Sequence, residues 1–153
     1  MTKKTLTLAM IFVFAHIAFV APFVPSKNIL PAGFGALSMT SMALVLVLAA
    51  RWRIVDRILG GPDKSYGSHR WLGLFAIGGG LAHWALASPV GLGTLPALAG
   101  RGSDAGLIAM LGLIVLTLAA MVRVIPYHIW KASHILMGAL FLLAAFHTFF
   151  VAS

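Results

Sequence analysis

Long stretches without a charged side chain constrain this chain more than any other feature. Of its 153 residues, 61% are hydrophobic and only 9% are Asp, Glu, Lys or Arg. A helix that crosses a bilayer needs about 20 mainly apolar residues. Such stretches cover residues 5–26, 28–50, 71–100, 105–122 and 132–153. We therefore expect an all-α, polytopic membrane helix bundle in one domain, 1–153, with five transmembrane helices at about 5–25, 30–50, 68–88, 105–122 and 128–151.

The polar composition excludes several kinds of site. The chain has no cysteine, which excludes disulfides, thiolate ligation and iron–sulfur clusters. It has no glutamate, and its three acidic residues, Asp56, Asp63 and Asp104, disfavour a paired-carboxylate hydrolase or a di-iron bundle. The net charge is +8, but the basic residues lie at the ends of the predicted helices. They are typical of topology signals, and we expect no nucleic-acid partner.

The basic residues also predict an orientation in the membrane. Lys3 and Lys4 precede an apolar stretch that is longer than the core of a signal peptide, so we interpret it as a first membrane helix. With the N-terminus in the cytoplasm, Lys27 and Arg101 lie outside. The remaining basic residues then lie inside: Lys3, Lys4, Arg51, Arg53, Arg57, Lys64, Arg70, Arg123 and Lys131. We expect an integral protein of the bacterial inner membrane.

Four histidines form two widely spaced pairs on two of the predicted helices. His69 and His83 are fourteen residues apart, and His134 and His147 are thirteen apart. Each pair spans roughly 20 Å along a helix, about two-thirds of the hydrocarbon core. Imidazole in an apolar span is costly and usually functional, and it is a common axial ligand of haem iron. The pattern predicts two haems, one near each membrane face. The alternative is that these are buried histidines that bond to neighbouring groups.

The direction of the two helices predicts how the histidines pair. Both helices run outward, so His69 and His134 would hold an inner haem, and His83 and His147 an outer one. At 100° per residue, fourteen steps return to within about 40° of the starting direction, whereas thirteen end about 140° away. We therefore expect the second helix to present its two ligands from different flanks.

Two segments resemble a known family. HRWLGLFAIGGGLAH, residues 69–83, and YHIWKASHILMGALFLLAAFH, residues 127–147, look like the two haem helices of the ferric reductase-like transmembrane domain. That family includes metalloreductases, NADPH oxidases and the haem partner of a bacterial methionine sulfoxide reductase. The resemblance covers about residues 30–150. It implies four helices around two stacked haems, with the ligand pairing given above.

The sequence departs from the family pattern at its C-terminus. Members generally have a further helix there, and in oxidases and metalloreductases a flavin- and nicotinamide-binding domain follows. This sequence ends at Ser153 and has no GxGxxG motif. We therefore expect FAD or FMN to act only through a partner or a missing domain. Without a CxxCH motif, the expected cofactors are two non-covalently held haem b groups.

Other residues have roles that the sequence leaves open. Arg70, Arg123 and Lys131 flank the inner histidines and are candidates to bind haem propionates, but they also suit the role of positive-inside anchors. His16 lacks a partner at haem spacing, so we predict a structural role. Residues 78–80, three glycines, and Gly138 are interpreted as sites of helix packing.

The predicted function is that of an oxidoreductase membrane domain. Electrons would pass from a cytoplasmic flavin-containing reductase through both haems to an acceptor on the outer face. Since the haem supplies the chemistry, we expect no catalytic side chain. The alternative is a stand-alone di-haem cytochrome b that carries electrons between quinone and a partner protein. Such cytochromes more often have spacings of about fourteen on both helices.

Overall fold

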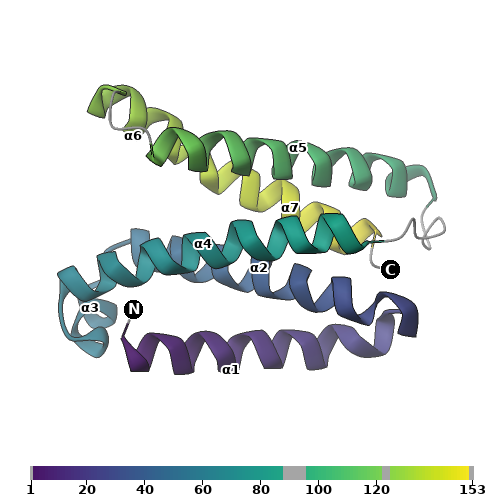
Figure 1. Ribbon diagram of the computed structural model, residues 1–153, viewed down its shortest axis with the longest axis horizontal. Helices are drawn as coiled ribbons and strands as arrows, with labels where there is room; N and C mark the ends of the chain where they lie inside the picture. The colour runs from purple at the N-terminus through teal and green to yellow at the C-terminus, as the bar shows by residue number, and fades with distance from the viewer. Residues whose placement is uncertain (1, 88–95, 122–124, 152–153) are drawn as a thin grey trace. The chain divides into compact units, whose positions relative to one another are not determined.

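The computed structural model describes residues 2–87, 96–121 and 125–151, and within these residues the regular secondary structure is helical throughout (Figure 1). The chain divides after Ala87 into two compact units, Met1–Ala87 and Ser88–Ser153, and each is described by itself. The helices of the first unit are α1 (Lys3–Val20), η1 (Ala21–Phe23), η2 (Ser26–Asn28), α2 (Ile29–Ala49), α3 (Arg53–Leu59) and α4 (Pro62–Leu86). Those of the second unit are α5 (Pro96–Met121), α6 (Tyr127–Ile135) and α7 (Met137–Val151).

The first unit is an antiparallel bundle in which α2 packs against both α1 and α4 (Figure 1). Small residues allow α2 and α4 to approach closely. A Cβ atom added at Gly79 would lie 2.9 Å from the carbonyl oxygen of Phe34 and 3.0 Å from the backbone nitrogen of Ser38. The Ser38 hydroxyl donates a 2.7 Å hydrogen bond to the carbonyl of Ala76. Close backbone approach and interhelical hydrogen bonds are the main sources of helix association in a bilayer.

Side-chain hydrogen bonds also hold α1 in place. Thr5 and Ser68, both buried, share a 2.9 Å hydrogen bond between their hydroxyls. Farther along α1, Nδ1 of His16 lies 3.0 Å from the Thr40 hydroxyl on α2. This interhelical bond supports the structural role that the sequence predicts for His16.

A short apolar cluster fixes the turn between α2 and α4. Ala9, Leu48, Leu59 and Leu72 are buried together, and Leu59 brings α3 into contact with the bundle. The α3 helix ends at Gly60, whose φ of 91° is left-handed, and Gly61 has a φ of 127°. Glycine adopts such angles without steric cost, and Pro62 then starts α4 with a preset φ. Gly60 and Gly61 thus separate α3 from α4, and α4 begins six residues before the predicted 68.

The second unit is a hairpin in which α5 packs against α7. Its described buried apolar residues are Ala105, Ala109, Met110, Leu113 and Leu140. A Cβ atom at Gly112 would lie 2.6 Å from Cδ2 of Leu140, so this glycine makes room for the leucine. The α5 helix begins at Pro96 rather than at the predicted 105. The prediction took Arg101 and Asp104 as the end of the apolar span, but polar residues at a membrane surface do not stop a helix.

The last predicted helix is interrupted at Leu136, between α6 and α7. The N–H of Leu136 donates to the carbonyl of Ser133, 3.0 Å away, which is the tighter i to i−3 pattern. The Ser133 hydroxyl itself donates a 2.9 Å bond to the carbonyl of Trp130. Serine side chains that bond back to their own helix often bend it, which accounts for the break.

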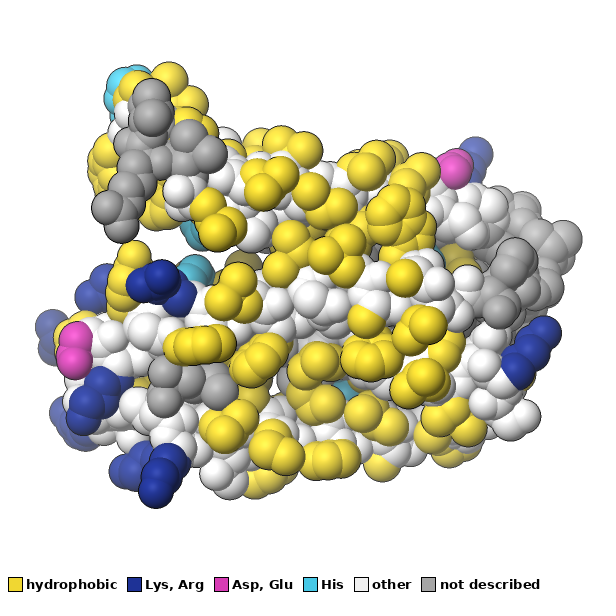
Figure 2. All heavy atoms as spheres, in the orientation of Figure 1, with side chains coloured by type: hydrophobic (Ala, Val, Ile, Leu, Met, Phe, Trp, Pro, Cys, Tyr) yellow, Lys and Arg dark blue, Asp and Glu magenta, His cyan; other side chains and the backbone are white. Residues whose placement is uncertain are grey.

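The chain is an all-helical integral membrane protein. In the part of the chain that the structure describes, four helical runs are long and apolar enough to cross a membrane: Lys3–Phe23, Ser26–Ala49, Gly100–Met121 and Tyr127–Val151. Large apolar side chains are exposed along the helices, as expected for lipid contact (Figure 2). The α4 helix has 25 residues but is not among these four, because two histidines, an arginine and several glycines make it less apolar. The predicted fifth span therefore rests on the sequence alone.

Candidate functional site

The first histidine pair lies on one uninterrupted helix. His69 and His83 both belong to α4, which runs without a break from Pro62 to Leu86, and both side chains are half-buried. Because α4 is unbroken, the angle of about 40° expected between residues fourteen positions apart applies to it. Both side chains therefore lie on nearly the same side of α4. His69 directly follows Ser68, whose side chain is fully buried and bonded to Thr5. The backbone that carries His69 is thus fastened to α1.

The His83 ring is held by the first turn of α2. Its Nδ1 atom lies 2.8 Å from the carbonyl oxygen of Pro31. A carbonyl only accepts hydrogen bonds, so Nδ1 carries the proton and donates it. A Cβ atom added at Gly35 would lie 3.1 Å from the same Nδ1 atom, so the ring rests against a glycine.

The His147 ring on α7 has the same arrangement in the second unit. Its Nδ1 atom donates to the carbonyl of Gly102 on α5 at 3.1 Å. A Cβ atom added at Gly106 would lie 2.7 Å from Cγ of the ring and closer still to Nδ1. Each of these two histidines therefore contacts the carbonyl of one helical residue and the glycine four positions later.

These hydrogen bonds determine which ring nitrogen can bind a metal. With the proton on Nδ1, the lone pair of a neutral imidazole is on Nε2. Histidines that bind metals usually donate their other N–H to a carbonyl or a carboxylate, which fixes the tautomer and the ring orientation. His83 and His147 thus have the donor chemistry that an axial haem ligand requires.

His134 lies on α6, two residues before the break at Leu136. Its half-buried ring stacks on Trp130, with ring centroids 5.1 Å apart and an interplanar angle of 20°. His134 and His147 therefore lie on either side of one interruption in the helical run Tyr127–Val151, and this interruption alone modifies the offset of about 140° expected for one straight helix. A residue wound as a 3₁₀ turn advances by about 120° rather than 100°, which reduces this offset.

The candidate propionate ligands are placed only in part. Arg70 on α4 and Lys131 on α6 have exposed side chains, whereas Arg123 lies outside the described residues. Basic side chains gather at one end of the first unit, where α1 and α4 begin and α2 ends (Figure 2). They are Lys3, Lys4, Arg51, Arg53, Arg57, Lys64 and Arg70, and we call them the basic end. Lys27 lies at the opposite end of the same unit, between α1 and α2.

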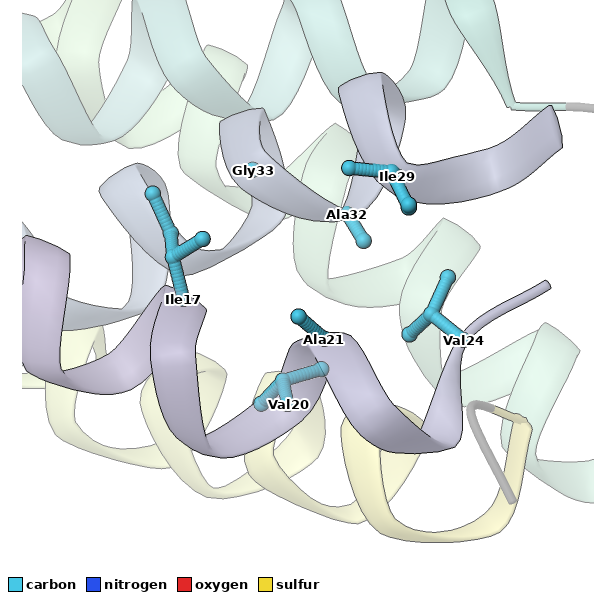
Figure 3. A pocket seen from close by; sticks show the side chains of 7 residues that line it. All are labelled: Ile17, Val20, Ala21, Val24, Ile29, Ala32 and Gly33. Carbon is cyan, nitrogen blue, oxygen red and sulfur yellow. The ribbon is translucent and has the colours of Figure 1, made fainter. Parts of the chain in front are cut away.

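Two further observations limit the kinds of site present. The hollow shown in Figure 3 lies between residues 17–24 and 29–33, and only apolar side chains and a glycine line it. It therefore offers no ligand to a metal or cofactor. Among the described residues, no three His, Asp or Glu side chains gather into a direct metal site. A haem needs only two axial side chains, because the porphyrin supplies the other four iron ligands.

Sequence reasoning missed the groups that hold His83 and His147. They are Pro31 and Gly35 in PAGFG, and Gly102 and Gly106 in GSDAG. A glycine four residues after the acceptor is the signal that these segments share. Of the glycines that the sequence singled out, Gly79 contacts α2, whereas a Cβ atom at Gly78 or Gly138 would meet nothing within 4 Å.

Comparison with known proteins identifies the family. The family described as "Ferric reductase like transmembrane component" matches residues 34–145, well over half of the chain. The match includes His69, His83 and His134, and His147 lies two residues beyond it. No curated protein and no solved structure matches the chain at a significant level. The predicted resemblance is confirmed, and the chain belongs to the ferric reductase-like transmembrane family.

Proposed function

We propose that this chain carries electrons across a membrane through two b-type haems, each held by two histidines. Membership of the ferric reductase-like family indicates an oxidoreductase membrane domain with a role in transmembrane electron transfer. The proposal adds the cofactors, their ligands and the direction of transfer. Electrons enter from a flavin-type donor in the cytoplasm and leave to an acceptor at the outer face.

The shared hydrogen-bond pattern of His83 and His147 carries this proposal. Each ring donates from Nδ1 to a helical carbonyl, at 2.8 Å and 3.1 Å, and so directs its lone pair to Nε2. His16, which has no partner at haem spacing, contacts the Thr40 hydroxyl and the backbone of Ala36, so a backbone partner supports haem ligation only together with the spacing of the histidine pairs. The two histidines proposed for one iron have the same tautomer, and it is the tautomer that haem ligation uses.

Each residue of the site has a defined role in the proposal. His69 and His134 hold the inner haem, and His83 and His147 hold the outer one. Arg70, Arg123 and Lys131 neutralise the propionates of the inner haem. The apolar helices exclude water from the electron path. When bound, haem supplies reversible one-electron redox chemistry that no side chain in this chain offers.

The basic end of the first unit suits the electron donor. Seven Lys and Arg residues gather there, while Lys27 lies at the opposite end of that unit. Such a field attracts an anionic flavin or an acidic protein surface. We therefore place a cytoplasmic reductase that carries FAD or FMN at this end.

Haem content is the direct test of the proposal. Protein purified in detergent and saturated with haem is expected to hold two haems per chain by the pyridine haemochrome method. Its spectrum should be that of low-spin, bis-histidine iron. A saturated content of one haem or none would overturn the proposal.

A vesicle experiment then tests the direction of transfer and the alternative function. Reduced flavin supplied on the side of the basic end should reduce both haems, and then an acceptor trapped on the other side. Reduction by a quinol but not by reduced flavin would favour a stand-alone di-haem cytochrome b instead. Protein-free vesicles with the same trapped acceptor give the background rate.

A further inference from the structure

We infer that two helical carbonyls, each exposed by a glycine four residues later, position the outer haem ligands and set their electron-donating strength. One is the carbonyl of Pro31 with Gly35 on α2, and the other is that of Gly102 with Gly106 on α5. We call each pair a carbonyl dock. This inference rests on the proposed function, because it assigns positioning residues to two of its ligands.

Helix geometry explains why each dock needs a glycine. In an α-helix, each Cα–Cβ bond tilts toward the N-terminus, so the side chain at i+4 lies beside the carbonyl of residue i. A Cβ at i+4 would therefore crowd the space through which an outside donor approaches that carbonyl. Glycine leaves this space open, and the second lone pair of the carbonyl can accept a bond from another helix.

The two docks are built alike but fit their rings with different tightness. At Gly35, an added Cβ atom would lie 3.1 Å from Nδ1 of His83 and 3.5 Å from Cγ. At Gly106, it would lie 2.7 Å from Cγ of His147 and 2.9 Å from Cε1. The His83 ring could yield by a few tenths of an ångström, whereas the His147 ring would have to move. The structure thus predicts a graded response to the same substitution.

The carbonyl docks should also affect the haem iron, because they change the basicity of the imidazole that binds it. A hydrogen bond from Nδ1–H makes the imidazole more basic, and a more basic ligand stabilises oxidised iron. The outer haem should therefore have a lower midpoint potential when the Nδ1–H bond to the carbonyl is intact than when this bond is weakened. Loss of a metal-supporting bond of this kind typically reduces metal affinity about 10- to 100-fold.

Matched glycine substitutions separate this effect from general damage to the helices. Gly106→Ala is compared with Gly100→Ala, on the same helix, where a Cβ atom would meet nothing within 4 Å. Gly35→Ala is compared with Gly33→Ala, where the nearest atom is a side-chain carbon of Ile17 at 4.0 Å. Because Gly35→Ala is the milder change, it keeps the inference testable if Gly106→Ala fails to fold.

The tautomers can be read without any haem. In haem-free protein labelled with ¹⁵N-histidine, NMR should show Nδ1 protonated and Nε2 unprotonated at both His83 and His147. The variants His83→Gln and His147→Gln identify which signals belong to each histidine. Gly106→Ala should abolish this pattern at His147, and Gly100→Ala should preserve it. A proton on Nε2 in the unsubstituted protein, or the same His147 signal in both variants, would overturn the inference.

With haem bound, Gly106→Ala should weaken outer-haem binding about tenfold and raise its midpoint potential, while the inner haem stays unchanged as an internal control. Gly35→Ala should have the same effects to a smaller degree, and both control variants should have none. If two haems bind but each dock variant behaves like its control, the inference fails and the proposed function stands. If no haem binds while the NMR pattern is as expected, the proposed function fails and with it the role of the docks toward haem, although the docks still position the two rings.

Discussion

At the scale of single residues, spacing along the chain separates a candidate haem ligand from a packing residue. His16 and His83 are both half-buried in the first unit, and each uses Nδ1 to contact α2. His16 contacts the Thr40 hydroxyl, which can donate or accept, and also makes a hydrogen bond with the backbone of Ala36. It has no partner at haem spacing, whereas His83 lies fourteen residues from His69. The carbonyl of Pro31 can only accept, so it fixes the tautomer of His83.

Substitution of these two histidines should therefore have opposite consequences. His16→Ala should leave two haems in place and lower the free energy of unfolding by about 1 kcal/mol, the usual net value of one hydrogen bond. His83→Ala should remove the outer haem and keep the inner one. Haem content and chemical unfolding in detergent measure both effects. Loss of haem in His16→Ala would contradict its structural role.

The same measurement tests how the four ligands pair. His69→Ala and His134→Ala should each remove the inner haem, and His147→Ala should match His83→Ala in removing the outer haem. Redox titration distinguishes the two haems if their potentials differ. If His69→Ala and His147→Ala gave the same spectrum, distinct from that of the other two variants, the pairing would be wrong.

The four candidate histidines can be singled out in the sequence, but the carbonyls that contact two of them cannot. Histidine spacing is a property of residue types along one chain segment, and it indicates a candidate ligand without any knowledge of packing. The partner of His147 is a backbone carbonyl 45 residues away, and every residue has a carbonyl. Only the arrangement of α5 against α7 shows that Gly102 is the residue that accepts.

At the scale of helices, the contact between α2 and α4 depends on a glycine that faces backbone atoms. A Cβ atom at Gly79 would lie within 3.0 Å of backbone atoms of Phe34 and Ser38, which cannot move without shifting α2. Gly78, its neighbour, faces open space. In a helix, alanine is favoured over glycine by roughly 0.5–1 kcal/mol when nothing obstructs it.

Gly79→Ala should therefore destabilise the protein by about 1–3 kcal/mol, the usual cost of overpacking, despite its better helix propensity. Gly78→Ala should be neutral or slightly stabilising and serves as the control. Chemical unfolding of both variants in the same detergent gives the comparison. Equal stabilities would show that α2 and α4 adjust to the added methyl group.

Two places where helices are interrupted show which local features can be predicted from the sequence. The break at Gly60-Gly61-Pro62 was predictable, because these residue types interrupt helices for steric reasons. The break at Leu136 has no proline or glycine at that position, and it accompanies the bond from Ser133 to the Trp130 carbonyl. Serine within an apolar segment is also compatible with a straight helix, so the residue types around Leu136 do not predict the break.

At the scale of the whole molecule, the charge distribution predicts an orientation that can be measured. In the first unit, seven basic residues lie at one end and Lys27 at the other. By the positive-inside rule, we expect the basic end to face the cytoplasm. The proposed function requires α4 to cross the membrane. If each histidine of α4 is to hold one of two haems, His69 and His83 must lie near opposite faces.

The absence of cysteine allows this to be tested with single-cysteine variants and a thiol reagent that cannot cross membranes. Ser26→Cys, between α1 and α2, should react from outside intact cells, and Lys64→Cys, at the start of α4, should react only after the membrane is opened. Gly100→Cys, near the start of α5, is the informative position. Reaction from outside means that α4 has crossed. If Gly100→Cys instead behaved like Lys64→Cys, α4 would lie on the inner side and could not connect an inner haem with an outer one.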